Sequence, residues 1–313
     1  MARKSFAVRL LSASTLSSCL VLAACATSQG STDSASASAS ASASASQPGD
    51  SASASASSSM VTNATGAALD TAIAGSWRTP ANVARDQYRH PKDTLGFFLV
   101  KPDATVIEIT PGAGWYTEIL SPYVRDNGHY IAAVWDDAIP KQPAYRYDLN
   151  KRLRAKIASN ADLYGKTEVR KFDAAHPNFG PANSADVVLT FRNAHNWVED
   201  GNAEAYFKAF FDVLKPGGTL GFVDHRAKPG TDLPTMIKSG YLTEDLVIGY
   251  SKAAGFRLEG KSDVNANPAD TTDHPNGVWT LPPTNQHDAA DDAKYKAIGE
   301  SDRMTLRFVK PAG

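Results

Sequence analysis

The chain has 313 residues, of which 42% are hydrophobic and 21% charged, and its formal net charge is −1. This length and composition supply enough apolar residues for a sizeable core. The near-neutral charge excludes the strongly basic surface typical of nucleic-acid binding, so we expect a soluble globular body without a nucleic-acid partner.

The first 25 residues have the pattern of a secretory signal peptide. A basic start with Arg3, Lys4 and Arg9 precedes a mostly apolar stretch, residues 10–24, that is too short to span a membrane comfortably. Its end, Leu-Ala-Ala-Cys at residues 22–25, resembles the bacterial lipobox, in which the cysteine is lipidated. The resemblance implies a lipid anchor at Cys25, and Ala26 implies the outer membrane, facing the periplasm. The alternative is an ordinary signal peptide with an incidental cysteine.

Cysteine usage and the next segment limit the chemistry further. Cys19 and Cys25 are the only cysteines, so a lipidated mature body would have no free thiol, disulfide or thiolate metal site. No H-E-x-x-H pattern occurs, and no metal site is expected. Ser-Ala repeats dominate residues 26–61, which predicts a disordered tether before a body at residues 62–313.

The body opens with three segments of helical spacing, at residues 67–74, 79–88 and 90–99. Pro80 and Pro91 stand at plausible first helical positions.

A strand, a glycine turn and a helix follow at residues 106–120. Glu108 lies in the β-branched run that precedes Pro-Gly-Ala-Gly, and glycines at 112 and 114 let a ligand approach the main chain. A dinucleotide fingerprint would need glycine at Thr117, and no phosphate-loop motif occurs. The pattern resembles motif I of the class I S-adenosylmethionine (SAM) dependent methyltransferases, with Glu108, Gly112 and Gly114 in register and Thr110 replacing its first glycine.

Acidic residues end the next two predicted strands. The helix at 115–124 contains Pro122, which should kink it or end it early. The strand at 130–135 ends at Asp136, which lies roughly 20 residues past Gly114, the spacing of a ribose-binding acid. Its alternative role is to cap the following loop.

After a helix at 149–159, the strand at 167–172 ends at Asp173, where the family resemblance implies a contact with the adenine amino group. Glu108, Asp136 and Asp173 should therefore meet at the carboxyl edge of a parallel sheet.

An apolar fourth strand at 185–191 leads into a polar loop, residues 192–197. The resemblance places the methyl acceptor beside this loop, and we count Asn193 with the cofactor-binding residues. His195 could accept a proton from the acceptor or be hydrogen-bonded within the loop. Arg192 could bind an anionic substrate group or pair with a nearby carboxylate.

A helix at 203–214 and the segment Leu-Lys-Pro-Gly-Gly at 214–218 precede the fifth strand. Gly217 and Gly218 should reverse the chain, and the segment closely resembles the one before the fifth strand of class I methyltransferases. The strand ends at Asp224 and His225, which are further catalytic candidates.

The last elements are a helix at 242–254 with Gly255 as its cap, a strand at 256–260 and a strand at 304–309. Between these strands, residues 261–302 form a long insertion, which is either a lid over a substrate or a surface decoration.

These elements predict one three-layer α/β/α Rossmann-like domain with a mostly parallel seven-stranded sheet. The resemblance implies strand order 3-2-1-4-5-7-6, an antiparallel last strand, SAM as cofactor and methyl transfer to a small-molecule or envelope acceptor. SAM is made in the cytoplasm, however, whereas the signal peptide exports the body. The alternative is therefore a non-catalytic binding lipoprotein on a methyltransferase scaffold. A third alternative, a hydrolase that uses Asp224 and His225, is the least favoured because the sequence has no G-x-S-x-G nucleophile elbow.

Overall fold

A computed structural model of the chain describes residues 66–313. The predicted signal peptide, the lipidation site at Cys25, the tether at 26–61 and the first residues of the body lie outside the described residues. Within residues 66–313, no helix combines the length and the apolar character that a membrane crossing requires.

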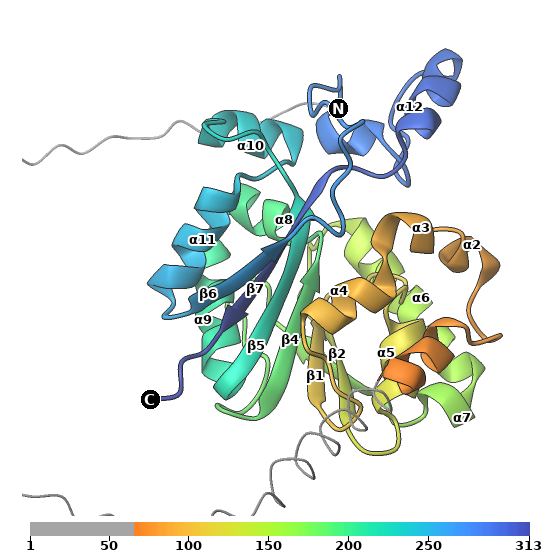
Figure 1. The fold of residues 1–313 in the computed structure, drawn as a ribbon, viewed down its shortest axis with the longest axis vertical. Helices are drawn as coiled ribbons and strands as arrows, with labels where there is room; N and C mark the ends of the chain where they lie inside the picture. The colour runs from red at the N-terminus through yellow and green to blue at the C-terminus, as the bar shows by residue number, and fades with distance from the viewer. Residues whose placement is uncertain (1–65) are drawn as a thin grey trace, which may run out of the picture. The chain divides into compact units, whose positions relative to one another are not determined.

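A seven-stranded sheet forms the centre of the body (Figure 1). Its order is β3-β2-β1-β4-β5-β7-β6, which confirms the predicted order. Neighbours among β1 to β5 pair in parallel, and β7 runs antiparallel between β5 and β6, as expected. The strands are β1 Thr105–Ile109, β2 His129–Trp135, β3 Glu168–Phe172, β4 Ala185–Phe191, β5 Leu214–His225, β6 Arg257–Ser262 and β7 Arg303–Val309.

Helices cover both faces of the sheet, so the body has the three layers expected (Figure 1). The predicted helix at 79–88 is two short helices, and α8 and α10 were not predicted from the sequence. The helices are residues 66–73, α2 Pro80–Val83, α3 Asp86–Arg89, α4 Pro91–Phe97, α5 Thr117–Val124, α6 Ala144–Ser159, α7 Ala161–Tyr164, α8 Ala194–Glu199, α9 Ala203–Val213, α10 Leu233–Ser239, α11 Glu244–Ala253 and α12 Asp292–Ile298, with 3-10 segments η1 Gly277–Thr280 and η2 Ala289–Asp291.

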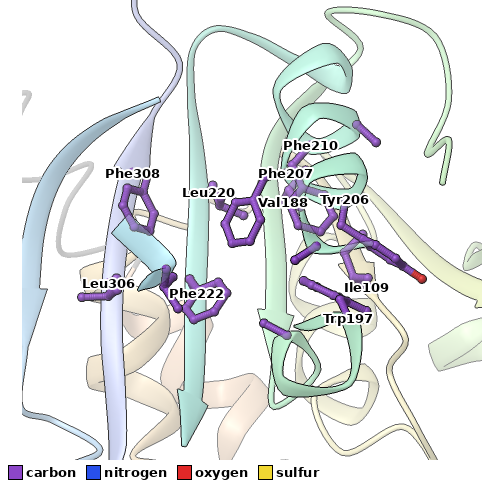
Figure 2. Packing of buried hydrophobic residues seen from close by; sticks show 14 of the residues in the cluster. Ile109, Val188, Trp197, Tyr206, Phe207, Phe210, Leu220, Phe222, Leu306 and Phe308 are labelled. Carbon is purple, nitrogen blue, oxygen red and sulfur yellow. The ribbon is translucent and has the colours of Figure 1, made fainter. Parts of the chain in front are cut away.

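Alternation along β1 divides the core into two layers, because successive side chains of a strand point to opposite faces. Ile107 and Ile109 belong to the layer under α8, α9 and α11, where Phe207 and Phe210 are fully buried (Figure 2). Val106 belongs to the other layer, together with buried residues of α4 and α5. Glu108 has the same parity as Val106, so its side chain lies on the α5 face.

Helix α5 continues through Pro122 to Val124, so it does not end early at the proline. A proline has no N–H, so the carbonyl of Glu118 loses its partner within the helix. The indole N–H of Trp77 donates to that carbonyl at 2.9 Å. A contact from 41 residues earlier in the sequence therefore satisfies the group that proline frees.

The Leu-Lys-Pro-Gly-Gly segment, expected to reverse the chain between a helix and the fifth strand, follows α9 directly and is the irregular beginning of β5. Ala185 pairs with Leu214 and Val187 with Thr219, so one residue of β4, Asp186, lies opposite four residues of β5, 215–218. Gly217 has a φ of +80° in this irregularity. The segment lies at the amino edge of the sheet, opposite the ligand-binding edge.

The insertion at 261–302 is folded onto the body around a buried carboxylate. Asp270 accepts hydrogen bonds from the Tyr241 hydroxyl at 2.9 Å and from the Asp302 N–H at 2.8 Å. His274 Nε2 lies 2.8 Å from the same carboxylate. The insertion therefore has a structural hydrogen-bond network of its own, and Pro283 reaches the cleft described next.

Candidate functional site

A cleft of about 860 Å³ lies at the carboxyl edge of β1, β2 and β4. This edge is where open α/β sheets bind ligands, and the volume lies within the range of small-molecule sites. The β1–α5 turn, the ends of β2 and β4, the N-terminal helices and α6 contribute its walls. The lining residues include Thr79, Asn82, Arg85, Arg89, Glu108, Thr110, Pro111, Gly112, Ala113, Trp115, Tyr116, Trp135, Arg152, Lys156, Arg192, Asn193 and Asn196.

The two predicted glycines of the turn have different functions. A Cβ on Gly112 would meet no atom within 4 Å, and Gly112 lines the cleft with a φ of +62°. A Cβ on Gly114 would lie 2.8 Å from the Lys156 side chain and 3.1 Å from that of Leu153. Gly112 therefore leaves room for a ligand, whereas Gly114 allows α6 to pack closely.

Thr110, which replaces the first motif glycine, has a left-handed φ of +46°. This region favours glycine, so the threonine is held in a strained conformation. Its Oγ1 is buried and has no hydrogen-bond partner, and the residue lines the cleft. An unpartnered hydroxyl at this position is available to a ligand.

Glu108 is buried in the cleft wall. Tyr130 donates a hydrogen bond to its Oε2 at 2.5 Å, and the Tyr130 hydroxyl also lies 2.9 Å from Thr117 Oγ1. Burial raises the pKa of Glu108 to about 7, although the Tyr130 hydrogen bond and the charge of Arg89 oppose the shift. This carboxyl group therefore titrates near neutral pH.

The other two predicted acidic residues, Asp136 and Asp173, bond to residues near them in the structure. Asp136 accepts the Ala138 N–H at 3.1 Å and lies 3.3 Å from Lys171 Nζ. Asp173 accepts the Ala175 N–H at 2.9 Å and pairs with His176 at 3.0 Å. Neither residue lines the cleft; each binds the loop that follows it. The three residues belong to the carboxyl ends of neighbouring parallel strands, as expected, but only Glu108 lines the cleft, and the ribose and adenine contacts stay predictions.

Arg192 and Asn193 do line the cleft, at the end of β4. Arg192 has a left-handed φ of +63°. Asn193 donates to the Ile109 carbonyl at 3.0 Å, which ties the end of β4 to the end of β1. The expected loop is in fact the short helix α8 from Ala194, so the residues after Asn193 are rigidly placed.

His195, Asp224 and His225 form a buried cluster beside the cleft, and none of them lines it. Asp224 accepts the backbone N–H groups of Ala194, His195 and His225 at 2.7, 3.2 and 2.8 Å. Its Oδ1 also lies 2.9 Å from His195 Nδ1.

Possible ligand atoms of these three residues lie within 4.8 Å of one another, a spacing compatible with a metal ion. Both oxygens of Asp224 are nevertheless occupied by N–H donors. Burial, followed by the charges of His195 and Arg192, lowers the pKa of His225 well below its usual value. The arrangement fixes the start of α8, and His195 reaches the cleft only through Asn196, whose amide lies 3.1 Å from His195 Nε2.

Sequence reasoning missed a group of charged residues at one end of the cleft. Arg89 lies in α3, and Arg85 is the residue before that helix. Glu300 lies at the end of the insertion, and Arg303 begins β7. These segments are more than 200 residues apart, and no local motif connects them. The sequence indicated only Arg192, as a residue that could bind an anionic substrate group.

The residues present fit the cofactor that motif I implies. The open face at Gly112 admits a ligand to the backbone, Thr110 Oγ1 needs a partner, and Glu108, Trp135 and Asn193 surround the same space.

Part of the chain matches a known protein family. Residues 108–222 match the family model described as a methyltransferase domain. No curated protein sequence matches the chain. Among solved structures, a SAM-dependent methyltransferase from Aquifex aeolicus is similar at 16% identity and a TM-score of 0.47, over 72% of this chain and 93% of that one.

Two further structures are similar at comparable levels. A putative sarcosine dimethylglycine methyltransferase from Galdieria sulphuraria has 16% identity and a TM-score of 0.49, over 74% of this chain and 86% of that one. The [4+2]-cyclase SpnF has 17% identity and a TM-score of 0.48, over 78% and 92%. Residues 108–222 therefore match a methyltransferase domain, and the strand order of the sheet is the one that the resemblance to class I methyltransferases implied.

Proposed function

We propose that this chain transfers a methyl group from SAM to an acceptor bound in the cleft at the carboxyl edge of the sheet. The observation that carries the proposal is the turn after β1. Gly112 opens its backbone to the cleft, the adjoining Thr110 hydroxyl is buried without a partner, and Glu108 lies in the same wall.

When bound, SAM supplies a methyl group activated by a sulfonium centre. The acceptor's lone pair forms a bond to the methyl carbon as the carbon–sulfur bond breaks, and the electron pair of that bond goes to sulfur. The protein's contribution is to bind and align the two molecules and to exclude water. Asn193 and α8 place rigid groups beside this position. For an acceptor that must lose a proton, His195 stays the predicted base; its Nε2 contacts the Asn196 amide, so it would have to exchange this contact for one with the acceptor.

Calorimetric titration of the purified full-length chain with SAM and with S-adenosylhomocysteine tests this proposal. We expect micromolar binding, which Gly112→Leu should abolish because its side chain would fill the ligand space. Gly217→Leu is a matched control: its φ is also positive and a Cβ there also meets no atom within 4 Å, but it lies at the opposite edge of the sheet. No binding of either ligand to a folded wild-type chain would overturn the proposal.

A second candidate is a non-catalytic binding lipoprotein on this scaffold. Its specific support is that Asp136 and Asp173 do not line the cleft and bond instead to the loops that follow them, although both were expected to hold the nucleoside. Under this alternative, a folded chain would bind neither SAM nor S-adenosylhomocysteine.

We further propose that the chain is anchored to the outer membrane, facing the periplasm, through a lipid on Cys25. The support is the Leu-Ala-Ala-Cys sequence after a basic and apolar N-terminus. Labelling of cells with a radioactive fatty acid tests it: the wild-type chain should carry the label, and Cys25→Ala should not. An unlabelled wild-type chain would refute the anchor.

A further inference from the structure

Four arginines surround one buried glutamate at the end of the cleft. Arg85 Nε donates to Glu300 at 2.5 Å and Arg303 Nη1 at 3.0 Å. Arg89 Nε and Arg192 Nη1 lie 3.5 and 3.8 Å from the same carboxylate. Arg85, Arg89 and Arg192 line the cleft, whereas Arg303 lies behind it with its side chain 4% exposed.

One carboxylate cannot satisfy these four guanidinium groups. Within residues 66–313, neither Arg89 nor Arg192 donates a hydrogen bond from its side chain, and Nε of each is buried without a partner. Arg85 Nη2 and Arg303 Nε are also buried and unpartnered. Arg89 is 8% exposed as a residue. Buried donors without acceptors are costly, which favours a missing acceptor at this site.

The charge balance points in the same direction. Glu300 neutralises one of the four arginines. Glu108, the next carboxyl group in the cleft wall, is used by Tyr130 and titrates near neutral pH. Arg226, a partly buried arginine outside the cleft, has two carboxylate partners. Its guanidinium group donates to both oxygens of Asp302 and to Asp263, each at 2.9 Å. The four arginines at the end of the cleft, in contrast, share the single carboxylate of Glu300.

Packing holds the arginines in place without a ligand. The guanidinium carbon of Arg89 lies 4.7 Å from the centre of the Trp115 ring, a cation–π contact. Arg192 is fixed at the end of β4, beside Asn193. Two cleft-facing guanidinium groups are thus pre-positioned on different elements, an arrangement suited to a planar or tetrahedral anion.

We propose that Arg89 and Arg192, assisted by Arg85, bind an anionic group of the methyl acceptor, a carboxylate or a phosphate. That the anion belongs to the methyl acceptor rests on the proposed function. The existence of an anion site does not depend on it. The cofactor's own carboxylate has the same chemistry, and the test must separate the two sources.

Inorganic phosphate is the first probe, titrated into the full-length chain by calorimetry at low ionic strength, with and without S-adenosylhomocysteine. We expect phosphate to bind in both conditions and Arg89→Gln and Arg192→Gln each to weaken it about tenfold or more, as for the loss of a charge-assisted hydrogen bond. Arg192→Lys keeps the charge and should retain part of the affinity. Arg257→Gln, on the exposed strand β6, is the control and should leave binding unchanged.

The second arm compares S-adenosylhomocysteine with methylthioadenosine, which lacks the amino-acid group. If the arginines bind the acceptor, the glutamine variants should leave the affinity for both nucleosides unchanged. If the variants weaken the binding of S-adenosylhomocysteine but not that of methylthioadenosine, the arginines bind the cofactor's carboxylate and the inference is wrong. Near-ultraviolet circular dichroism of each variant confirms folding.

The two proposals fail in different ways. Phosphate that does not bind, or binds equally to wild type and both glutamine variants, overturns the anion site even when S-adenosylhomocysteine binds. Binding of phosphate that depends on the arginines, without binding of either nucleoside, supports the anion site and overturns the methyl-transfer proposal instead.

Discussion

Tyr130 and Glu108 are joined by a hydrogen bond across two neighbouring strands, directly beneath the ligand-binding turn. Tyr130 pairs in register with Val106, and Glu108 with Ala132, so the two side chains are diagonal neighbours on the same face. The phenol donates at 2.5 Å to a carboxyl group that burial deprives of water. The pKa of Glu108 is consequently raised to about 7.

This raised pKa predicts that Glu108 makes stability depend on pH. Its contribution is complete below about pH 4.5, the unfolded-state pKa, and is lost as the pH rises through about 7. The loss should be at most about 3 kcal/mol, from about 1.4 kcal/mol per pKa unit. Urea unfolding at pH 5 and pH 8 should show a smaller pH effect in Glu108→Gln than in wild type. Glu199→Gln, at an exposed position, is the control and should keep the full pH effect. An equal change in unfolding free energy between pH 5 and pH 8 in all three proteins would contradict the raised pKa of Glu108.

The Trp77 contact predicts an energetic coupling with Pro122. Trp77→Phe removes the donor to the Glu118 carbonyl and should reduce the free energy of unfolding by about 1–2 kcal/mol. In a Pro122→Ala background, the new N–H of residue 122 can supply that bond, so the same Trp77→Phe change should cost less. A double-mutant cycle by urea unfolding measures the coupling. Additive effects would show that the indole does not replace the helix bond.

Glu300 should be essential to stability because it is the shared partner of the arginines. Burial alone would raise its pKa, but the charges of Arg89, Arg303, Arg192 and Arg85 lower it to about 2. Glu300→Gln should therefore destabilise the chain by about 3–5 kcal/mol at neutral pH, the cost of breaking a buried ion pair. In wild type the Glu300 contribution is complete above about pH 4.5 and is lost as the pH falls toward 2. Thermal melts of both proteins at pH 7 test the first expectation; matching midpoints would refute it.

Asp136 offers a test of how the nucleoside is held. Its carboxylate bonds to Ala138 and pairs with Lys171 outside the cleft, so Asp136→Asn should weaken S-adenosylhomocysteine by less than about tenfold. Calorimetric titration with S-adenosylhomocysteine measures the affinity of this variant, and Ala138→Gly, in the same loop, is the control. A loss of about a hundredfold or more would mean that the side chain turns into the cleft when the ligand binds, as the sequence spacing suggested.

The fold could be predicted from the sequence because its strands carry strong local signals. The apolar run Ala185–Phe191 is a strand with the predicted bounds, and Pro80 and Pro91 begin helices as expected. The failures are tertiary. Helix α5 survives Pro122 because Trp77 satisfies its free carbonyl, and the glycines at 217 and 218 are accommodated within β5 by an irregular register.

The site was predictable where one short segment supplies it. Motif I places Glu108 and Gly112 in the cleft, and the end of β4 places Arg192 and Asn193 there. Strand-end position could not determine where Asp136 points, since its loop N–H groups compete for the carboxylate. The arginine cluster was not predictable, because Arg89 and Glu300 meet only after the insertion has folded against the N-terminal helices.

A crystal structure of the full-length chain with S-adenosylhomocysteine tests the central claim most directly. We expect ligand density in the cleft, in contact with the backbone at Gly112 and beside Trp135, with its sulfur facing the arginine end. Ligand density at another site, or a cleft without ligand density at saturating S-adenosylhomocysteine, would contradict the claim.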